Sequence, residues 1–486
     1  MLGFGLRHRQ DFMTAVKTLT QQGRWEQVCS MFLEMQELAM EADQIHYGAT
    51  INACGKGQQW ELTLGMLTEM EERHVEPNVI IFNTVISACG KGGRWLLALA
   101  MLLAMQEQDL QPTVISFNAA ISACEKGEQW VQALGVLAEM QALELEPTVV
   151  SFNAAISSCE KGERWELALA MFAAMGKQDV EPDVISFNAA ISACEKGEQW
   201  VRALGMLAEM EEQDLQPDLI SFNAAISACE KCKEWEGALG MLAKMREQLL
   251  MPDVISSNAA VSACEKVRKW ELALELLVEM TERCFEPDVI TYSAAISACS
   301  EGKQTERAWQ LVEVMQQQGL TPNVITYSAV MRACEKGQQP ERTLELLQNM
   351  QQQRFSPNRI TYTAAIGAWS NIRQPERAIE LLQIMEQHGF TPDAITYTAA
   401  ISGCSTGNQS VRALQLLERM QQHGLTPSVL ACSVAISACE NVGQPEEVSR
   451  LFQIMQQQGL MLLTSGCSQS EGSPYIGAGC THIVTV

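Results

Sequence analysis

A repeat of fixed length dominates this sequence. The stretch from Val184 to Asp218 reads VISFNAAISACEKGEQWVRALGMLAEMEEQDLQPD, and near-copies follow one another every 35 residues from Gln44 to Leu463. The twelve units contain no insertion or deletion. Such a period is typical of stacked supersecondary units and not of separate globular domains. Units are numbered internally from 1 to 35, so that Val184 is position 1 and Asp218 is position 35.

Each unit has the hydrophobic pattern of two helices. Phe187, Ile191 and Cys194 fall at i, i+4 and i+7 and form one apolar stripe, and a second stripe of the same spacing begins at Trp200. Gly197 is expected to end the first helix in the left-handed cap conformation. Neither helix can bury its stripe alone, so the hairpins must stack. The pattern predicts an all-α, right-handed α-solenoid superhelix of helix-turn-helix hairpins.

The composition is acidic, with a net charge of -24 over 486 residues. In the unit from Val184 to Asp218 most acidic residues lie at the end of the second helix and in the connector. If the first helices line one surface of the solenoid, most acidic side chains lie on other surfaces, and the net charge then reflects solubility more than the properties of that surface.

The cysteines are expected to be packing residues. Seventeen cysteines are present, and eleven of them occupy position 11 of a repeat. Equivalent positions of stacked repeats are too far apart for a disulfide. We therefore interpret them as small buried apolar residues of a protein in a reducing compartment.

The chain divides by sequence into four segments. Residues 1–8 form a leader too short for a full transit peptide, and residues 9–43 resemble a degenerate repeat that caps the array, with Trp25 at the usual tryptophan position. Residues 44–463 are the twelve repeats. Residues 464–486 are rich in Gly, Ser and Thr and are predicted to be a flexible tail.

The first five and the last two residues of the units resemble those of a known repeat family. Val-Ile-Ser-Phe-Asn or Val-Ile-Thr-Tyr-Ser at the head, and Pro-Asp or Pro-Asn at the foot, in a 35-residue hairpin are similar to the pentatricopeptide repeat. The tetratricopeptide repeat has a 34-residue period and a different tryptophan–tyrosine pattern. The resemblance implies binding of single-stranded RNA, one base per repeat, read by two or three side chains.

The resemblance assigns base reading to positions 5 and 35. These positions vary among a few polar residues while the framework is nearly constant, and Asn, Ser and Thr are poor mid-helix residues that a purely structural array would avoid. The alternative is that they only cap helices or bond to the backbone. The assigned residues are Asn83, Thr113, Asn118, Thr148, Asn153, Asp183, Asn188, Asp218, Asn223, Asp253, Asn258, Asp288, Ser293, Asn323, Ser328, Asn358, Thr363, Asp393, Thr398 and Ser428.

These pairs imply a target sequence. An asparagine amide offers a donor and an acceptor to a pyrimidine edge, whereas a hydroxyl is shorter and leaves room for a purine. By resemblance to the family's code, the units from Val149 to Asp288 select four uridines, those from Val289 to Asn358 two adenines, and the unit ending at Asp393 a guanine. The two units from Val79 to Thr148 select pyrimidines. The implied target is close to YYUUUUAAG, 5′ to 3′ along the chain; the unit with Gly48 and the last two units fit the code poorly.

Two further positions gain roles from the resemblance. Position 2 is apolar throughout and would wedge each base between repeats, although ordinary packing between repeats would also explain it: Ile80, Ile115, Val150, Ile185, Ile220, Ile255, Ile290, Ile325, Ile360 and Ile395. Position 13 is lysine in most units and would contact phosphate, although a lysine also suits a helix C-terminus: Lys56, Lys91, Lys126, Lys161, Lys196, Lys231, Lys266 and Lys336.

No pattern of catalytic residues is present. The chain lacks an HxE motif with a downstream PCxxC, a phosphate loop and a nucleophile–base set, and the one CxxC, Cys229 with Cys232, has no second pair. The sequence predicts no enzyme, cofactor, metal or membrane contact, since the apolar run from Trp95 to Met105 is too short to span a bilayer. The resemblance implies that the protein acts in RNA processing, stability, editing support or translation, and that it recruits processing or editing proteins. It implies a mitochondrial or chloroplast location, and a cytoplasmic one is not excluded. The alternative is a protein-binding helical scaffold.

Overall fold

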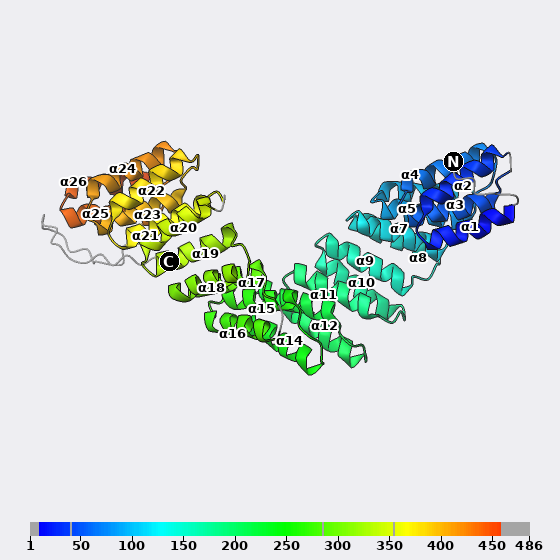
Figure 1. The fold of residues 1–486 in the computed structure, drawn as a ribbon, viewed down its shortest axis with the longest axis horizontal. Coiled ribbons are helices and arrows are strands. Elements are labelled where there is room, and N and C mark those ends of the chain that lie inside the picture. The colour runs from blue at the N-terminus through cyan, green and yellow to red at the C-terminus, as the bar shows by residue number, and fades with distance from the viewer. Residues whose placement is uncertain (1–8, 39–40, 284–285, 353–354, 458–486) are drawn as a thin grey trace, which may run out of the picture. The chain divides into compact units, whose positions relative to one another are not determined.

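All regular structure in the described part of the chain is helical (Figure 1). The computed structural model describes residues 9–38, 41–283, 286–352 and 355–457, which contain 26 α-helices and no strand. The predicted leader and tail, and Leu463, lie outside these residues. None of the described helices has the length and apolar character needed to cross a membrane. The chain divides into two compact units, residues 1–263 and 264–486, with the division inside α15 (Val254–Lys266).

The first unit consists of helical hairpins in the predicted register. Its leading helices are α1 (Arg9–Gln21), α3 (Gln44–Lys56), α5 (Val79–Lys91), α7 (Val114–Lys126), α9 (Val149–Lys161), α11 (Val184–Lys196) and α13 (Leu219–Lys231). Its second helices are α2 (Trp25–Glu37), α4 (Trp60–Glu72), α6 (Trp95–Glu107), α8 (Trp130–Ala142), α10 (Trp165–Lys177), α12 (Trp200–Glu212) and α14 (Trp235–Glu247).

The second unit repeats this arrangement. Its leading helices are α17 (Val289–Glu301), α19 (Val324–Lys336), α21 (Arg359–Asn371), α23 (Ala394–Thr406) and α25 (Val429–Val442). Its second helices are α16 (Trp270–Glu282), α18 (Thr305–Gln317), α20 (Pro340–Gln352), α22 (Pro375–Gln387), α24 (Ser410–Gln422) and α26 (Pro445–Gln457). The predicted solenoid of stacked hairpins is therefore confirmed.

Leading helices form one continuous layer within each unit. In the first unit α5, α7, α9 and α11 each contact the next leading helix, as Figure 1 shows, and in the second unit α17, α19, α21 and α23 do the same. Apart from the helices that adjoin α15, each second helix packs on its own leading helix and, where another leading helix follows, on that one too. Within the described parts of each unit, consecutive second helices do not contact one another. The surface of the leading helices is thus the one that neighbouring repeats share.

The core of each hairpin comes from the two predicted stripes. In the repeat that begins at Val184, the side chains of Phe187, Ile191, Cys194, Ala203 and Met210 are all fully buried. The position-11 cysteines are free thiols, and burial raises the pKa of the Cys194 thiol to about 11. Their interpretation as buried packing residues is confirmed.

The predicted role of Gly197 is wrong. Its φ is -81° and ψ 3°, an ordinary conformation, and the left-handed residue is the next one, Glu198, with φ 55°. Glycine is needed at position 14 for space, because a Cβ on Gly197 would lie 2.3 Å from Cγ of Trp165 in the preceding repeat. In six repeats the glycine at position 14 lies against the tryptophan of the preceding second helix, whereas Cys232 and Val267 occupy that position after Trp200 and Trp235.

We expect Gly197→Ala to destabilise the protein by about 1–3 kcal/mol, the usual cost of overpacking. Gly205→Ala is the matched control, since Gly205 lies in α12 of the same repeat and a methyl group there would meet no other atom within 4 Å. That change should stabilise by about 0.5–1 kcal/mol through helix propensity. Urea unfolding measures both, and equal effects of the two substitutions would contradict the packing account.

Candidate nucleic-acid interface

Position 35 of each repeat caps the leading helix of the next repeat. Asp218 has extended backbone, with φ -102° and ψ -178°, and its Oδ1 accepts a hydrogen bond from the backbone N–H of Ser221 at 2.9 Å. The Asp218 N–H in turn donates to Oγ of Ser221 at 3.1 Å. The same reciprocal capping box occurs at Thr113, Thr148, Asp183, Asp288 and Asn323. The capping role considered for this position is therefore present.

Two of the capping aspartates, Asp183 and Asp393, are held in their ionised form. Burial of Asp183 opposes ionisation, but hydrogen bonds from the backbone of Ser186 and the side chain of Asn153 outweigh it and lower the pKa of the carboxyl. For Asp393, burial is likewise outweighed by hydrogen bonds from Thr396 and by the charge of Arg359, and its pKa is lowered. Position 35 is thus an acceptor-only group in the repeats that end at Asp183 and Asp393.

The asparagines at position 5 reach position 35 of their own repeat. Nδ2 of Asn153 donates to Oδ1 of Asp183 at 3.0 Å, and Nδ2 of Asn188 lies 3.1 and 3.2 Å from the two carboxylate oxygens of Asp218. Asn223 contacts Asp253 in the same way, at 3.3 and 3.1 Å. The structure therefore brings together two positions that are 30 residues apart in sequence. Asn118 makes the equivalent bond to Thr148 at 3.3 Å.

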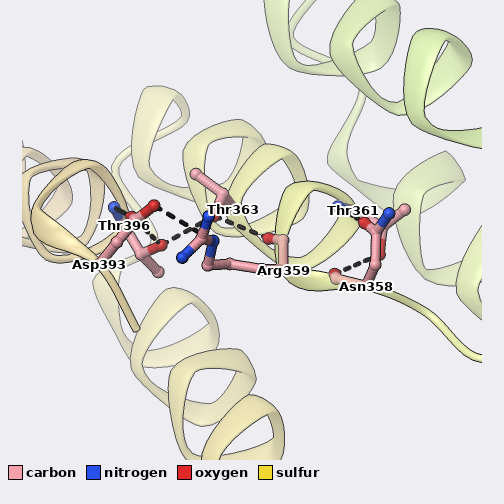
Figure 2. A network of polar contacts seen from close by, with 6 residues as sticks. All are labelled: Asn358, Arg359, Thr361, Thr363, Asp393 and Thr396. Carbon is pink, nitrogen blue, oxygen red and sulfur yellow. Dashed lines mark hydrogen bonds and ion pairs between the residues drawn. The ribbon is translucent and has the colours of Figure 1, made fainter. Parts of the chain in front are cut away.

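The hydroxyls at position 5 behave differently from the asparagines. Ser328, Thr363 and Thr398 each donate to the backbone carbonyl four residues earlier, at 2.6, 2.8 and 2.6 Å. Their oxygens are left as acceptors. In Figure 2, Thr363 lies between Arg359 and Thr396, and Oγ1 of Thr396 is 2.8 Å from Oγ1 of Thr363 and 2.8 Å from Oδ1 of Asp393, so its single hydrogen can be donated to either of them. Thr396 thus links positions 5 and 35 of this repeat.

Not every predicted pair is joined. Within the described residues no hydrogen bond connects Asn83 to Thr113, and the buried Oδ1 of Asn83 has no partner.

Arg359 is a polar residue of this surface that the sequence analysis did not single out. It occupies position 1, where most repeats have valine, and its Nε lies 3.3 Å from Oδ2 of Asp393, as Figure 2 shows. Its side chain is half-exposed, so guanidinium donors remain free to reach a ligand. Arg359 could have been noticed in the sequence, because it is the only charged residue at position 1 among the twelve repeats.

The apolar side chains at position 2 are exposed to solvent in all twelve repeats, between 53% at Leu430 and 73% at Ile80. Packing between repeats therefore does not explain why they are apolar. Near α23 and α25, Ile395 and Leu430 line a hollow of about 360 Å³ together with Thr398 and Ser428. Positions 2, 5 and 35 thus meet at one hollow between consecutive repeats.

The lysines at position 13 fall into two groups. Lys161, Lys196 and Lys231 form ion pairs with the glutamate at position 12 of the preceding repeat, at 2.9, 2.7 and 3.0 Å, and Lys336 pairs with Glu301 at position 13 of the preceding repeat, at 2.5 Å. For Lys56, Lys91 and Lys126, position 12 of the preceding repeat is Thr20, Gly55 and Gly90. These three side chains are exposed and have no acidic partner in the described part of the chain. Lys266 has an interaction partner.

Glu335, at position 12, is followed by a repeat that has no lysine at position 13. Position 13 of the repeat after Glu335 is Asn371, whose Nδ2 donates to the Glu335 backbone carbonyl at 3.2 Å. Burial raises the pKa of the Glu335 carboxyl to about 6, against the opposing charges of Lys336 and Arg332.

Among the described residues, no group of three His, Cys, Asp or Glu side chains could hold a metal ion. Cys229 is buried and Cys232 is half-buried, with its Sγ 3.1 Å from the Glu198 carbonyl oxygen. The geometry of this surface is that of a row of polar groups flanked by apolar side chains, an arrangement that suits stacked bases.

Three sequence profiles of one repeat family match the chain. A profile described as Pentatricopeptide repeat domain matches residues 30–92, 205–267 and 275–337, and one described as PPR repeat family matches 77–126, 147–196 and 362–406. A third, PPR repeat, matches 115–145, 185–215, 255–285, 325–355, 395–425 and 431–460. No curated protein matches the sequence significantly.

Solved structures of repeat proteins share the fold. The pentatricopeptide repeat protein PPR10 from maize is 19% identical, with a TM-score of 0.57 over 93% of this chain and 74% of that one. PPR10 in complex with an 18-nucleotide psaJ RNA element is 20% identical, with a TM-score of 0.48 over 93% of this chain and 75% of that one. At these identities the first likeness establishes the helical repeat fold.

We expect Glu335→Gln to stabilise the protein at pH 8. The folded state raises this pKa from its ordinary value of 4.5 to about 6, so the stability that protonation contributes is complete below pH 4.5 and is lost as pH rises through 6. The amide avoids that loss, which amounts to at most about 2 kcal/mol. Thermal unfolding from pH 4.5 to 8 should show the variant's advantage growing with pH.

Glu301→Gln is the control, since Glu301 lies at the neighbouring repeat position, position 13, and has a lysine partner. The hydrogen bond from Lys336 lowers the pKa of Glu301, so its contribution is present at neutral pH and is lost as pH falls through the lowered pKa. This variant should therefore be less stable than wild type at pH 8. If both variants lose stability at pH 8, the account of Glu335 is wrong.

Proposed function

Because this chain belongs to the pentatricopeptide repeat family, we propose that it is a sequence-specific single-stranded RNA-binding protein that contacts one base with each repeat. The observation that carries the proposal is the contact between positions 5 and 35 beside exposed apolar side chains. In one repeat this is Asn188 bonded to Asp218, with Ile185 and Ile220 exposed at 62% and 60% on either side.

Each base lies between the position-2 side chains of two consecutive repeats. Its edge faces positions 5 and 35 of the first of them, where an amide with an aspartate complements uracil and a hydroxyl admits a purine. The hollow between Ile395 and Leu430, with Thr398 and Ser428 in its lining, has the form required of such a site. The same roles extend to the other pairs from Asn83 to Ser428, and the target remains YYUUUUAAG in the 5′ to 3′ direction along the chain.

Phosphate contact is concentrated at the N-terminal end. Lys56, Lys91 and Lys126 have no acidic partner in the part of the chain that the structure describes and can neutralise phosphates directly. Lys161, Lys196 and Lys231 must first exchange a glutamate for a phosphate, so each contributes less to affinity. The lysines at position 13 are therefore not equivalent.

Residues 44–463 are the RNA-facing repeats of this proposal and residues 9–43 their N-terminal cap. The proposal places the protein in RNA processing, stability, editing support or translation in a mitochondrion or chloroplast. It includes no catalytic step of the protein's own, so any processing or editing is carried out by recruited proteins.

The proposed function is tested with a nine-nucleotide RNA, UUUUUUAAG, and its variant UUGGGGAAG. We expect the full chain to bind the first RNA at least tenfold more tightly, since each mismatched base removes a hydrogen-bonded edge. Affinity for the first RNA should also fall as salt rises. Equal affinity for both RNAs would contradict sequence-specific reading, and no binding to either would favour the protein-binding scaffold.

The same titrations distinguish the two groups of lysines. Replacing Lys56, Lys91 and Lys126 together by alanine should reduce the magnitude of the slope of log K against log salt by about 2, because each lost phosphate contact contributes roughly 0.7 to it. Replacing Lys161, Lys196 and Lys231 together should change the slope less, because their charge is already balanced by glutamate. A larger change in the second triple variant would show that the ion pairs open on binding.

A further inference from the structure

A buried hydroxyl occupies position 3 in nine consecutive repeats. Every one of these side chains is 0% exposed: Ser116, Ser151, Ser186, Ser221, Ser256, Thr291, Thr326, Thr361 and Thr396. A hydroxyl sealed from water must find hydrogen-bond partners within the protein. The capping box supplies one of them, position 35 immediately before it, as described for Ser221 and Asp218.

A second partner lies in the preceding repeat. Oγ of Ser151 is 2.6 Å from Oδ1 of Asn118, Oγ of Ser186 is 2.6 Å from Oδ1 of Asn153, and Oγ of Ser221 is 2.5 Å from Oδ1 of Asn188. Each of these asparagines is at position 5, 33 residues earlier in the chain.

Hydroxyl-bearing repeats make the same contact. Oγ1 of Thr326 is 2.7 Å from Oγ of Ser293 and 3.0 Å from Oδ1 of Asn323. Thr396 connects Thr363 with Asp393 at 2.8 Å on each side (Figure 2). The contact therefore survives the change of position 5 from Asn to Ser or Thr.

The contact fixes which way round an asparagine amide faces. The amide has two N–H donors and two acceptor sites. At Asn188 one donor is directed to Asp218 and one acceptor site receives the Ser221 hydroxyl, which places Nδ2 and Oδ1 on defined sides. One donor and one acceptor site remain for a ligand. Without the hydroxyl, only the bond from Nδ2 to the aspartate would hold the amide against a flip, as it does at Asn223.

Two repeats that fit the base code poorly also lack this hydroxyl. After Gly48, position 3 of the next repeat is Ile81, whose Cγ1 would lie 3.5 Å from a Cβ on that glycine. After Thr398, position 3 of the next repeat is Ala431, and Thr398 bonds only to its own helix backbone at 2.6 Å among the described residues. The polar side chain at position 5 and the hydroxyl of the following repeat are thus both absent after Gly48, whereas Thr398 remains but has no hydroxyl partner in the following repeat.

We propose that the position-3 hydroxyls of Ser151, Ser186, Ser221, Thr326 and Thr396 are positioning groups that orient the base-reading side chain of the preceding repeat. Recognition of one base is then shared between two repeats. This inference rests on the proposed function, and it assigns the base selectivity of Asn188 in part to Ser221, a residue that contacts no base itself.

The test is the selectivity of Ser221→Ala at the fourth nucleotide of UUUUUUAAG, the base assigned to Asn188. Selectivity is the ratio of Kd for the RNA with C, A or G at that nucleotide to Kd for the RNA with U. We expect the ratio to fall about three- to tenfold, the loss of one orienting hydrogen bond. The ratio at the ninth nucleotide should stay unchanged. Ser221→Thr keeps the hydroxyl and should retain the wild-type ratio.

Ser256→Ala is the matched control. Ser256 makes the same capping bonds to Asp253, at 2.8–3.1 Å, but its hydroxyl does not reach Asn223, whose buried Oδ1 has no partner in the described part of the chain. It loses the same capping energy without the contact to position 5. Selectivity at the fifth nucleotide, assigned to Asn223, should therefore remain that of wild type.

The outcomes separate this inference from the proposed function. If wild type does not distinguish bases at the fourth nucleotide, the proposed function fails, and this inference with it. If wild type distinguishes them and Ser221→Ala does so equally well, or if Ser256→Ala loses as much selectivity, only the positioning role is overturned. Should Ser221→Ala not fold, Ser186→Ala at the third nucleotide decides the question in the same way.

Discussion

The hydrogen bonds of the position-35 side chain hold the repeats in register. The carboxylate of Asp218 caps the following leading helix through the Ser221 N–H and also accepts from Asn188 of the repeat that it ends. Asp218 thus caps one leading helix and accepts a hydrogen bond from a side chain, Asn188, of the leading helix before it. Because capping requires a polar group with extended backbone, position 35 is always close to the surface that consecutive leading helices share. Under the proposed function, the stability of the fold and the contact with RNA therefore depend on the same atoms.

The charge of the molecule is distributed in agreement with this arrangement. A net charge of -24 is unusual for a protein that contacts phosphate. Along the leading helices, however, each of Glu125, Glu160 and Glu195 is balanced by a lysine of the next repeat. The first three position-13 lysines have no such partner among the described residues, so the excess positive charge of this surface lies at the N-terminal end. The overall charge says little about the surface formed by the leading helices.

The sequence predicts the fold well because the repeat is visible in it. The stripe of Phe187, Ile191 and Cys194 predicted a leading helix, and α11 spans Val184–Lys196. Gly197 was assigned a left-handed cap because glycine commonly serves there, whereas the left-handed residue is Glu198. Its true constraint, the ring of Trp165, belongs to another repeat and cannot be deduced from spacing within one.

The candidate site was predictable only in part for the same reason. Positions 2, 5 and 35 were found from the resemblance, and their proximity followed from the 35-residue period. The partners of Lys196 and Ser221 were missed because they lie 36 and 33 residues earlier, on a neighbouring helix. The exposure of Ile185 could not be predicted either, since an apolar residue at that spacing is equally compatible with buried packing.

The central claim is that consecutive bases occupy consecutive repeats along the leading helices. It is tested most directly by photo-crosslinking the full chain to UUUUUUAAG with 4-thiouridine at a single position and identifying the modified residues by mass spectrometry. With the label at the fourth nucleotide, the account predicts crosslinks in α11 or α13 near Ile185 and Ile220, and a shift of 35 residues when the label moves by one nucleotide. Crosslinks in the second helices, or a site that does not move with the label, would contradict it.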